Sequence, residues 1–380
     1  MMLLEHMGKA ELAARGLAVP RGFVATSHDQ AVDAADSLGG RVVVKAQIPA
    51  GGRGKAGGIL RVPNPAAAGM AAASLLYRPL LGHRVNSVLV EERLDIAKEL
   101  FLGLAVDPAA AGYLALFSDQ GGINIEEVAV SAPATVRRLH LEPAADLPAN
   151  AARQLADGLL DESLVEQLQS VLAGLFATFR ERDALIAEIN PLALLADGRL
   201  VAADCRMEVD DDSLYRQPQW GSYRESLFDE RERLAQQIGV SYVALDGDVG
   251  LIASGAGLGM ASLDMLKLAG LSPANFLDTG GGITRELMRR AVELTLYPER
   301  VRGELINLYG GINPMVEAAL GIANALKTMA QRKPLVVKLL GNRQEEAWAI
   351  LEAEGVPVTK VVRTEDATHR LAGLLAGGAR

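Results

Sequence analysis

The feature that most constrains the fold is a strict alternation of strand-like and helix-like segments from Asp246 onward. Each short apolar run is followed by a longer segment with apolar residues at helical spacing. The predicted strand and helix pairs are Val249–Ala253 and Gly259–Ala269, Asn275–Leu277 and Ile283–Leu296, Gly303–Tyr309 and Pro314–Gln331, Leu335–Leu339 and Gln344–Glu354, and Val356–Val362 and Ala367–Leu375. Because neighbouring parallel strands need a long crossover, usually a helix, this alternation predicts an α/β fold with a doubly wound parallel sheet of flavodoxin-like size.

A chain of 380 residues is long enough for more than one domain. We expect a nucleotide-binding domain over residues 1–235, with a subdomain at about 20–95, and the parallel-sheet domain over residues 240–380. A net charge of −9 argues against nucleic acid as a partner, and no apolar run approaches the roughly 18 residues that span a membrane. Cys205 is the sequence's single cysteine, which excludes a disulfide framework and suits a reducing, cytoplasmic compartment.

The beginning of the chain predicts an amphipathic helix over Leu3–Gly16. Charged residues recur there at the spacing of a solvent-facing helix surface, among them Glu5 and Lys9. This segment is therefore not expected to be a signal peptide.

A glycine-rich, basic segment, Arg41–Ile59, indicates a phosphate site. An apolar strand ends at Lys45, and the loop that follows carries Arg53 and Lys55 among its glycines, Gly51, Gly52, Gly54, Gly57 and Gly58. Glycine lacks a Cβ, so several backbone N–H groups can approach one anion while the cations supply charge. The spacing matches neither a Walker loop nor a dinucleotide fingerprint, so the loop would act as a flap over a nucleotide. The alternative is a hairpin loop with a solvated basic tip.

Carboxylates and an amide recur at predicted strand ends in the first domain, namely Glu91, Glu99, Glu188, Asn190 and Asp204. Strand alternation places Glu188 and Asn190 on one face, and a hairpin through Asp197-Gly198 would bring Asp204 beside Asn190. Oxygen ligands of this kind suit Mg²⁺, which shares its other positions with water and substrate phosphates. Any one of these residues could instead be an ordinary surface charge. With the flap, they favour a Mg-nucleotide site.

The predicted β-to-α turns of the second domain are glycine-rich at Ser254–Leu258, Thr279–Ile283 and Tyr309–Ile312. In an open parallel sheet such turns gather at the carboxyl edge, where ligands bind. Asn313 and Pro314 would start the next helix, so the amides before them would face a helix N-terminus that favours an anion. The alternative is that glycine only permits tight turns. Together the turns favour a site for a small carboxylate or phosphate.

Several motifs, in this order, resemble those of the succinate–CoA ligase (succinyl-CoA synthetase) β-subunit family: AGGRGKAGG at 50–58, LVEERLDIAKEL at 89–100, IAEINPLALLADGRLVAAD at 186–204, ANFLDTGGG at 274–282 and YGGI at 309–312. The resemblance covers essentially the whole chain. It implies an ATP-grasp domain followed by a flavodoxin-like ligase-CoA domain. It also implies an acid–thiol ligase subunit that uses ATP or GTP with Mg²⁺.

The resemblance also implies roles for single residues. Lys45 and Gly52-Arg53-Gly54 would hold the nucleotide phosphates, while Glu91, the backbone at Leu94 and Glu99 would hold the base and ribose. Asn190 and Asp204 would bind Mg²⁺, and Glu188 would face the histidine that is phosphorylated in this family. That histidine and the CoA site would belong to a partner α subunit, in keeping with the chain's own histidines, which lie outside the glycine-rich turns (His6, His28, His83, His140 and His369).

The chain departs from the family pattern mainly where the carboxylate would bind. That site is implied at Ser254, Gly310, Gly311, Ile312 and Asn313. Ser254 replaces a usual Asn, and Asn313-Pro314-Met315 replaces Arg-Cys-Asp. Beside Asp204, Cys205-Arg206 replaces Gly-Lys. We therefore expect the acid to be succinate or a bulkier dicarboxylate.

Two other functions remain open from the sequence. One is a stand-alone ATP-grasp carboxylate–amine ligase, which would not need the second domain. The other is a non-catalytic scaffold subunit that binds nucleotide but has lost the acid site.

Overall fold

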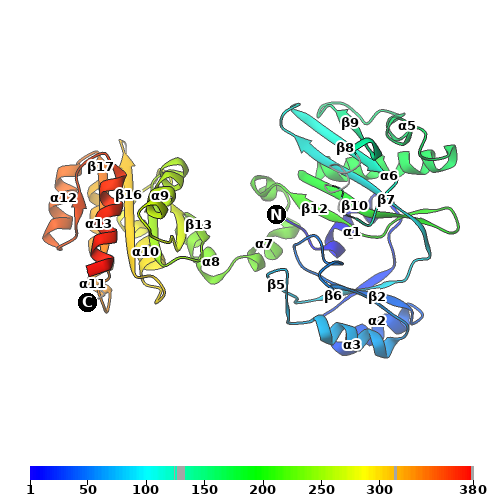
Figure 1. The fold of residues 1–380 in the computed structure, drawn as a ribbon, viewed down its shortest axis with the longest axis horizontal. Coiled ribbons are helices and arrows are strands. Elements are labelled where there is room, and N and C mark those ends of the chain that lie inside the picture. Colours follow the sequence, from blue (N-terminus) through cyan, green and yellow to red (C-terminus); the bar gives the residue numbers. More distant parts are fainter. Residues whose placement is uncertain (124, 126–132, 312–314, 378–380) are drawn as a thin grey trace. The chain divides into compact units, whose positions relative to one another are not determined.

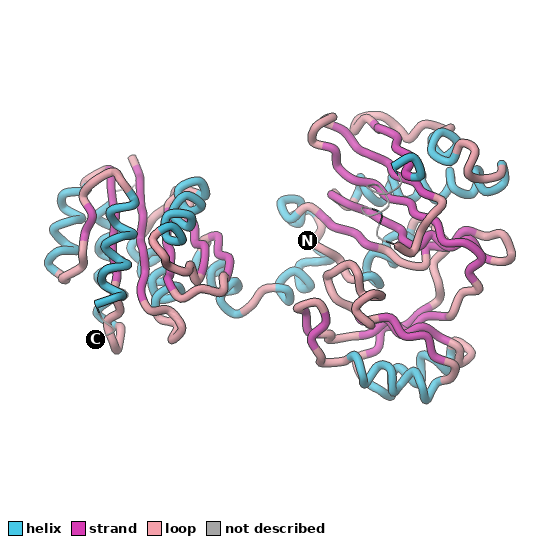
Figure 2. Tube along the Cα trace, in the orientation of Figure 1, coloured by secondary structure: helices cyan, strands magenta, loops and turns pink. Residues whose placement is uncertain are grey.

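The computed structural model describes residues 1–123, 125, 133–311 and 315–377. The chain forms two compact units, Met1–Gly221 and Ser222–Arg380. Figure 2 shows helices and strands interleaved along the chain in both. In the part of the chain that the structure describes, no helix is both long and apolar enough to cross a membrane.

The first unit contains an antiparallel sheet that carries Lys45. Its strand order is β1–β6–β2–β3, with β1 at Gly22–Ala25, β2 at Val42–Ala46, β3 at Ile59–Val62 and β6 at Val88–Glu92. Helices α2 (His28–Ser37) and α3 (Pro65–Leu75) pack together on one face of this sheet (Figure 1). Both helices have side-chain N-caps, because Ser27 and Asn64 accept the N–H groups of Gln30 and Ala67. A short hairpin, β4 (Pro79–Leu80) with β5 (His83–Arg84), follows α3.

A second antiparallel sheet in this unit has the order β11–β10–β7–β8–β9, and β12 also pairs with β10. Its strands are β7 (Ile96–Asp107), β8 (Gly112–Ser118), β9 (Val136–Leu141), β10 (Ala184–Leu195), β11 (Leu200–Ala202) and β12 (Arg206–Val209). The unit's further elements are α1 (Glu5–Ala14), α5 (Ala151–Ala156), α6 (Glu162–Glu181), η1 (Pro133–Thr135), η2 (Asp211–Arg216) and η3 (Pro218–Trp220). The α6 side chains Leu168, Leu172, Leu175 and Phe179 recur every three or four residues and are buried, so its helical spacing reflects a face packed on the sheet.

The second unit contains the predicted parallel sheet. Its strand order is β13–β15–β14–β16–β17–β18, with β13 at Ser241–Ala244, β14 at Val249–Ala253, β15 at Asn275–Asp278, β16 at Gly303–Gly310, β17 at Leu335–Gly341 and β18 at Val358–Thr359. The pairs from β15 through β18 are parallel, whereas β13 pairs with β15 antiparallel. The parallel strands thus follow the flavodoxin-like order 2-1-3-4-5, which reverses between β14 and β16.

Helices cover both faces of this sheet (Figure 1). They are α8 (Glu230–Ile238), α9 (Ala256–Leu268), α10 (Arg285–Leu296), α11 (Met315–Thr328), α12 (Gln344–Ala353) and α13 (Thr364–Gly377), and α7 (Gly221–Leu227) precedes them along the chain. One apolar core joins α9 and α13 to the sheet through Leu266, Leu305 and Leu371. A larger core joins α10, α11 and α12 to the other face through residues such as Val292, Ile306 and Ile322. Two cores separated by one sheet define a doubly wound unit, as the alternation predicted.

Some elements differ from the sequence-based expectation. The 3₁₀ helices η2 and η3, which follow β12, were not predicted. The predicted strand Val356–Val362 is regular only at Val358–Thr359, and the edge strand β13 was not predicted. Ile312, Asn313 and Pro314 lie outside the described residues.

Candidate functional site

A cavity of about 1350 Å³ in the first unit gathers the side chains that the sequence singled out. Both sheets contribute to it, together with the glycine flap between β2 and β3. Its lining includes every residue predicted for the phosphates, base, ribose, metal and catalysis: Lys45, Gly52, Arg53, Gly54, Glu91, Leu94, Glu99, Glu188, Asn190 and Asp204. Segments more than 150 residues apart in sequence therefore meet at one place.

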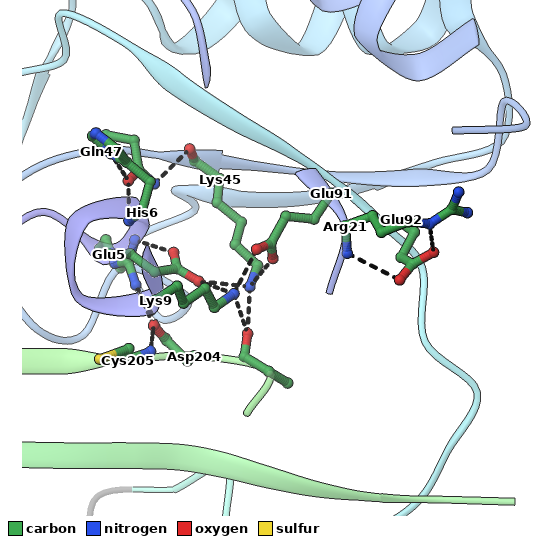
Figure 3. Close-up of polar contacts among 12 residues, drawn as sticks. Glu5, His6, Lys9, Arg21, Lys45, Gln47, Glu91, Glu92, Asp204 and Cys205 are labelled. Carbon is green, nitrogen blue, oxygen red and sulfur yellow. Dashed lines mark hydrogen bonds and ion pairs between the residues drawn. The ribbon is translucent and has the colours of Figure 1, made fainter. Parts of the chain in front are cut away.

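At the inner end of the cavity, Glu5, Lys9, Lys45 and Glu91 form a closed ring of opposite charges (Figure 3). The Nζ atom of Lys45 lies 2.8 Å from both Glu5 and Glu91, and that of Lys9 lies 2.8 Å from Glu5 and 2.6 Å from Glu91. The carbonyl oxygen of Ala203 accepts a hydrogen bond from each lysine. Each buried charge in the ring thus has opposite charges in contact, which offsets its loss of hydration.

Two members of this ring, Glu5 and Lys45, are held in their ionised forms. Burial by itself would raise the pKa of Glu5, but the attraction of Lys45, Lys9 and Arg53 lowers that pKa well below its usual value. Burial would lower the pKa of Lys45, yet Glu5 and Glu91 raise it above its usual value. Lys45, predicted to contact phosphate, therefore stays cationic although only 7% of its surface is exposed.

Arg53 extends from the flap into the same cluster. Its Nη1 donates to Glu5 Oε2 at 2.6 Å, and its Nη2 donates to both carboxylate oxygens of Asp204 at 2.8 and 3.0 Å. The flap itself is a run of tight turns, in which Gly58 donates to the Arg53 carbonyl and Ala56 to that of Gly52. Gly52 has φ +75°, which glycine adopts without strain. The Arg53 side chain, which was expected to contact phosphate, thus anchors the flap to Glu5 and Asp204.

At the end of the cavity that was predicted to bind metal, the predicted hairpin forms. Strands β10 and β11 pair through Leu192–Ala202, and the Ala203 N–H donates to the Pro191 carbonyl, which brings Asp204 back toward Asn190 as expected. Asn190 Nδ2 donates to Glu188 Oε1 at 3.0 Å. The amide oxygen of Asn190 on β10 and the carboxylate of Asp204, just after β11, are hard donors of the kind that suits a Mg²⁺ ion sharing its remaining positions with phosphate and water.

Glu188 also lies opposite Arg206, a cationic residue for which the sequence predicted no role in the site. It pairs in register with Arg206 of β12, and Arg206 Nη1 lies 3.7 Å from Glu188 Oε2. Both residues line the cavity. Glu188 is therefore held between the Asn190 amide and a guanidinium, at the end of the site where the partner's histidine was expected.

The end of the cavity that was predicted to hold the base and ribose is formed by the start of β7 and the segment after β8. Gly122 donates its N–H to Asn190 Oδ1 at 2.7 Å, and a Cβ at Gly122 would overlap the carboxylate of Glu99. Leu94 lines this end of the cavity. Glu91, also predicted for the base and ribose, lines the cavity, and its carboxylate contacts Lys9 and Lys45 in the charge ring.

In the second unit, the glycine-rich turns follow β14, β15 and β16 at the carboxyl edge of the sheet, as predicted. Ser254 is bonded to the backbone of Tyr309, and Asp278 Oδ1 accepts the N–H groups of Gly255 and Gly280 at 2.6 and 2.8 Å. Gly310 is the last residue of β16, and Gly311 follows it. The expected substrate residues Ile312 and Asn313 are among those not described.

Sequence reasoning missed Glu5, Lys9, Gly122 and Arg206 as parts of the site. Glu5 and Lys9 were expected on a solvated helix surface, but both are buried, because α1 packs under the cavity. The i, i+4 spacing of opposite charges was the only signal for them. Gly122 could have been suspected from the Gly121-Gly122 pair, since consecutive glycines allow close approach.

Comparison with known proteins covers the whole chain. The sequence profile described as "ATP-grasp domain" matches residues 2–194, and that described as "CoA-ligase" matches residues 252–373. The chain is 39% identical over 379 residues to "Succinate--CoA ligase [ADP-forming] subunit beta 2" of Streptomyces coelicolor, covering 100% of this chain and 98% of that protein. It is 41% identical over 385 residues to the corresponding "subunit beta" of Rubrobacter xylanophilus, covering 100% of both.

A solved structure also shares the fold. ATP citrate lyase from Methanothrix soehngenii, in complex with citrate and coenzyme A, matches with a TM-score of 0.69 at 18% identity. The match covers 94% of this chain and 92% of that one.

Proposed function

The chain belongs to the succinate–CoA ligase β-subunit family, and we propose from this premise how its cavity takes part in the reaction. The predicted fold class, an ATP-grasp domain followed by a flavodoxin-like ligase-CoA domain, is confirmed. So is the predicted class of function, the β subunit of an acid–CoA ligase that uses a nucleotide. The alternative of a carboxylate–amine ligase is wrong.

Our proposal is that the chain binds ATP with Mg²⁺ and works with an α subunit. The names of its relatives, which specify ADP formation, support ATP over GTP. The overall reaction would be ATP + dicarboxylate + CoA → acyl-CoA + ADP + phosphate. The γ-phosphoryl group would pass to a histidine of the partner, then to the carboxylate as an acyl phosphate, and the CoA thiol would displace phosphate. The observation that carries the proposal is the convergence of Lys45, Arg53, Asn190 and Asp204 on one cavity.

Each side chain has a proposed part. Lys45, Arg53 and the amides of the flap would hold the phosphates, and charge on the phosphates is what such groups stabilise in phosphoryl transfer. Leu94 and Glu99 would hold the base and ribose, while Glu91, through its contact with Lys45, would position that lysine. Glu188 Oε1 or Oε2 would accept the N–H of the partner's imidazole and so orient it. Asn190 and Asp204 would hold Mg²⁺, which neutralises phosphate charge when bound.

The second unit would supply the carboxylate site. Its turns after β14 and β16 flank the point where the strand order reverses, which is where open α/β sheets bind ligands. Ser254, Gly310 and Gly311 would lie against the acid, with Ile312 and Asn313 beside them. We propose a dicarboxylate bulkier than succinate as the preferred acid.

Asn190→Ala and Asp204→Ala test the metal assignment. In the complex with the α subunit, each should lose Mg²⁺-dependent transfer of the γ-phosphoryl group to the α histidine, followed with radiolabelled ATP. Calorimetric titration should show that ATP binding no longer strengthens when Mg²⁺ is added, while circular dichroism stays that of the parent. Mg-ATP binding equal to the parent's in both variants would refute the assignment.

A further inference from the structure

Asp204 has two competing uses in the proposed function, and both involve the same carboxylate oxygens. Both of its carboxylate oxygens accept hydrogen bonds from Arg53 Nη2, at 2.8 and 3.0 Å. A divalent cation on the same oxygens would stand in contact with the guanidinium, and like charges at contact distance repel. Metal coordination by Asp204 therefore competes with its pairing to Arg53 Nη2.

Arg53 has a second anchor that does not compete with metal. Its Nη1 donates to Glu5 Oε2 at 2.6 Å and to the Ala46 carbonyl at 3.1 Å. Glu5 is only 2% exposed and is fixed by Lys9 and Lys45, whereas the Asp204 side chain is 23% exposed. One arm of the guanidinium is thus held in the protein interior, and the other ends at the cavity.

We propose that Glu5 is a positioning residue. It holds Arg53 in the cavity while the Asp204 carboxylate exchanges its contact with Arg53 for coordination of the metal. This inference rests on the proposed function, in which Asp204 binds Mg²⁺ and Arg53 binds phosphate. Release from Asp204 leaves Nη2 free to donate to a phosphate oxygen. Metal and nucleotide therefore strengthen each other's binding through Arg53, in addition to their direct contact.

The exchange predicts shifts of opposite sign for two variants. Arg53→Met removes the competitor, so Asp204 should bind a divalent cation more tightly when no nucleotide is present. Glu5→Gln weakens the interior anchor and leaves Arg53 more strongly paired with Asp204, so the same affinity should fall. General damage to the site would weaken binding in both variants.

The measurement uses Mn²⁺ as the probe, counted by electron paramagnetic resonance in the complex of the full chain with its α subunit, without nucleotide. Asp204→Asn gives the baseline from other Mn²⁺ sites. Arg53→Met should lower the Mn²⁺ dissociation constant about tenfold, the effect of losing one charged contact. Glu5→Gln should raise the Mn²⁺ dissociation constant several-fold. Glu5→Asp keeps the negative charge but places the carboxylate farther from Arg53, so it should also raise this constant. Arg206→Met is the matched control, because it also removes a cavity guanidinium near Asp204 but one that pairs with Glu188.

The outcomes separate this inference from the proposed function. If Asp204→Asn leaves Mn²⁺ binding in the presence of ADP unchanged, the metal assignment itself is wrong. If Asp204→Asn weakens that binding but Arg53→Met changes the nucleotide-free affinity no more than Arg206→Met, the exchange is wrong while the metal assignment stands. If Arg53→Met tightens Mn²⁺ binding but neither Glu5 variant weakens it, Glu5 is not the positioning residue.

Discussion

The hydroxyl of Ser254 is bonded twice to the backbone of Tyr309, donating to its carbonyl oxygen at 3.1 Å and accepting from its N–H at 2.8 Å. Ser254 directly follows β14, and Tyr309 lies near the end of β16, the parallel strand beside it. The side chain thus joins the strands beyond their last backbone pair, Ala253–Asn307, at the point where the strand order reverses. The Ser254 hydroxyl bonds the protein backbone. Because its side chain is shorter than the Asn usual in the family, Ser254 leaves more room for a substrate at this edge of the sheet.

The space at Ser254 predicts a change in acid preference. Ser254→Asn adds a longer amide side chain and should favour succinate over more substituted dicarboxylates. The expected change in discrimination is about 1–3 kcal/mol, the range for one hydrogen-bonding group. The measurement is kcat/KM for a panel of small dicarboxylates in the reconstituted complex. Ser254→Ala, which removes the backbone bonds without adding bulk, is the control and should lower stability more than it reorders the acids. Succinate as the parent's best acid, with the ranking unaltered in Ser254→Asn, would contradict this idea.

The flap offers a matched pair of glycines for a second prediction. Gly52 has φ +75°, whereas Gly54 lies outside the left-handed region and a Cβ there would make ordinary contact with Ile59 at 3.7 Å. Gly52→Ala should therefore cost about 1–2 kcal/mol in the flap conformation and weaken nucleotide binding by roughly tenfold. Gly54→Ala should change it much less. Calorimetry gives the affinities, and thermal unfolding should show little loss for either variant because the flap serves the ligand. A loss of melting temperature without loss of affinity in Gly52→Ala would support an ordinary hairpin loop.

Much of the fold was predictable because apolar runs of strand length alternated with helical spacing, as in Gly303–Tyr309 and the segment after it. The missed strands lacked that signal. In β9, Arg137, Arg138 and His140 interrupt the apolar pattern, and pairing with β8 decides the structure. Strand β13 is short and lies at the edge of the sheet, and half of its residues are exposed.

The site was predictable where glycine and oxygen-bearing side chains stand at strand ends, as at Gly52 and Asp204. It was not predictable at Glu5 and Lys9, because an i, i+4 pair of opposite charges has the same pattern on a solvated helix as on a helix packed under a cavity. The buried helix differs from a solvated one because Lys45 and Glu91, from the sheet that contains β2 and β6, contact its charged residues. That contact depends on tertiary structure. Arg206 was missed for the same reason, since its partner Glu188 lies on another strand.

A third prediction concerns the contact of Gly8 with Cys205. A Cβ at Gly8 would lie 2.7 Å from the Cys205 Sγ, which is buried beside Asp204. Gly8→Ala should gain about 1 kcal/mol in helix propensity but lose about 1–3 kcal/mol from overpacking. In the Cys205→Ala background the clash is gone, so the same change should stabilise. Urea unfolding of the parent, the single variants and the double variant gives the coupling energy. Equal effects of Gly8→Ala in both backgrounds would show that the contact does not limit packing.

The final prediction concerns Glu304, at the start of β16, which is fully buried in the second unit. Thr295 donates to its Oε1, while no partner for Oε2 is found within the described residues. Burial raises the pKa of Glu304 from its usual 4.5 to about 8, against the opposing effects of the Thr295 bond and Lys333. At neutral pH this carboxyl group is therefore protonated in the folded chain and ionised in the unfolded one.

Because the folded pKa is the higher one, the stability contributed by neutral Glu304 is complete below about pH 4.5 and is lost as pH rises toward 8. Within that window the free energy of unfolding of the second unit should fall by at most about 1.4 kcal/mol per pH unit. Glu304→Gln should match the parent near pH 4.5 and be clearly more stable at pH 8.5. Urea unfolding at both values, followed by Trp348 fluorescence in a Trp220→Phe background, reports on this unit alone, since the sequence has two tryptophans. Glu299→Gln, at an exposed position nearby, is the control and should show no such divergence. A Glu304→Gln variant that follows the parent's pH dependence would mean that Glu304 ionises in the folded chain as freely as in the unfolded one.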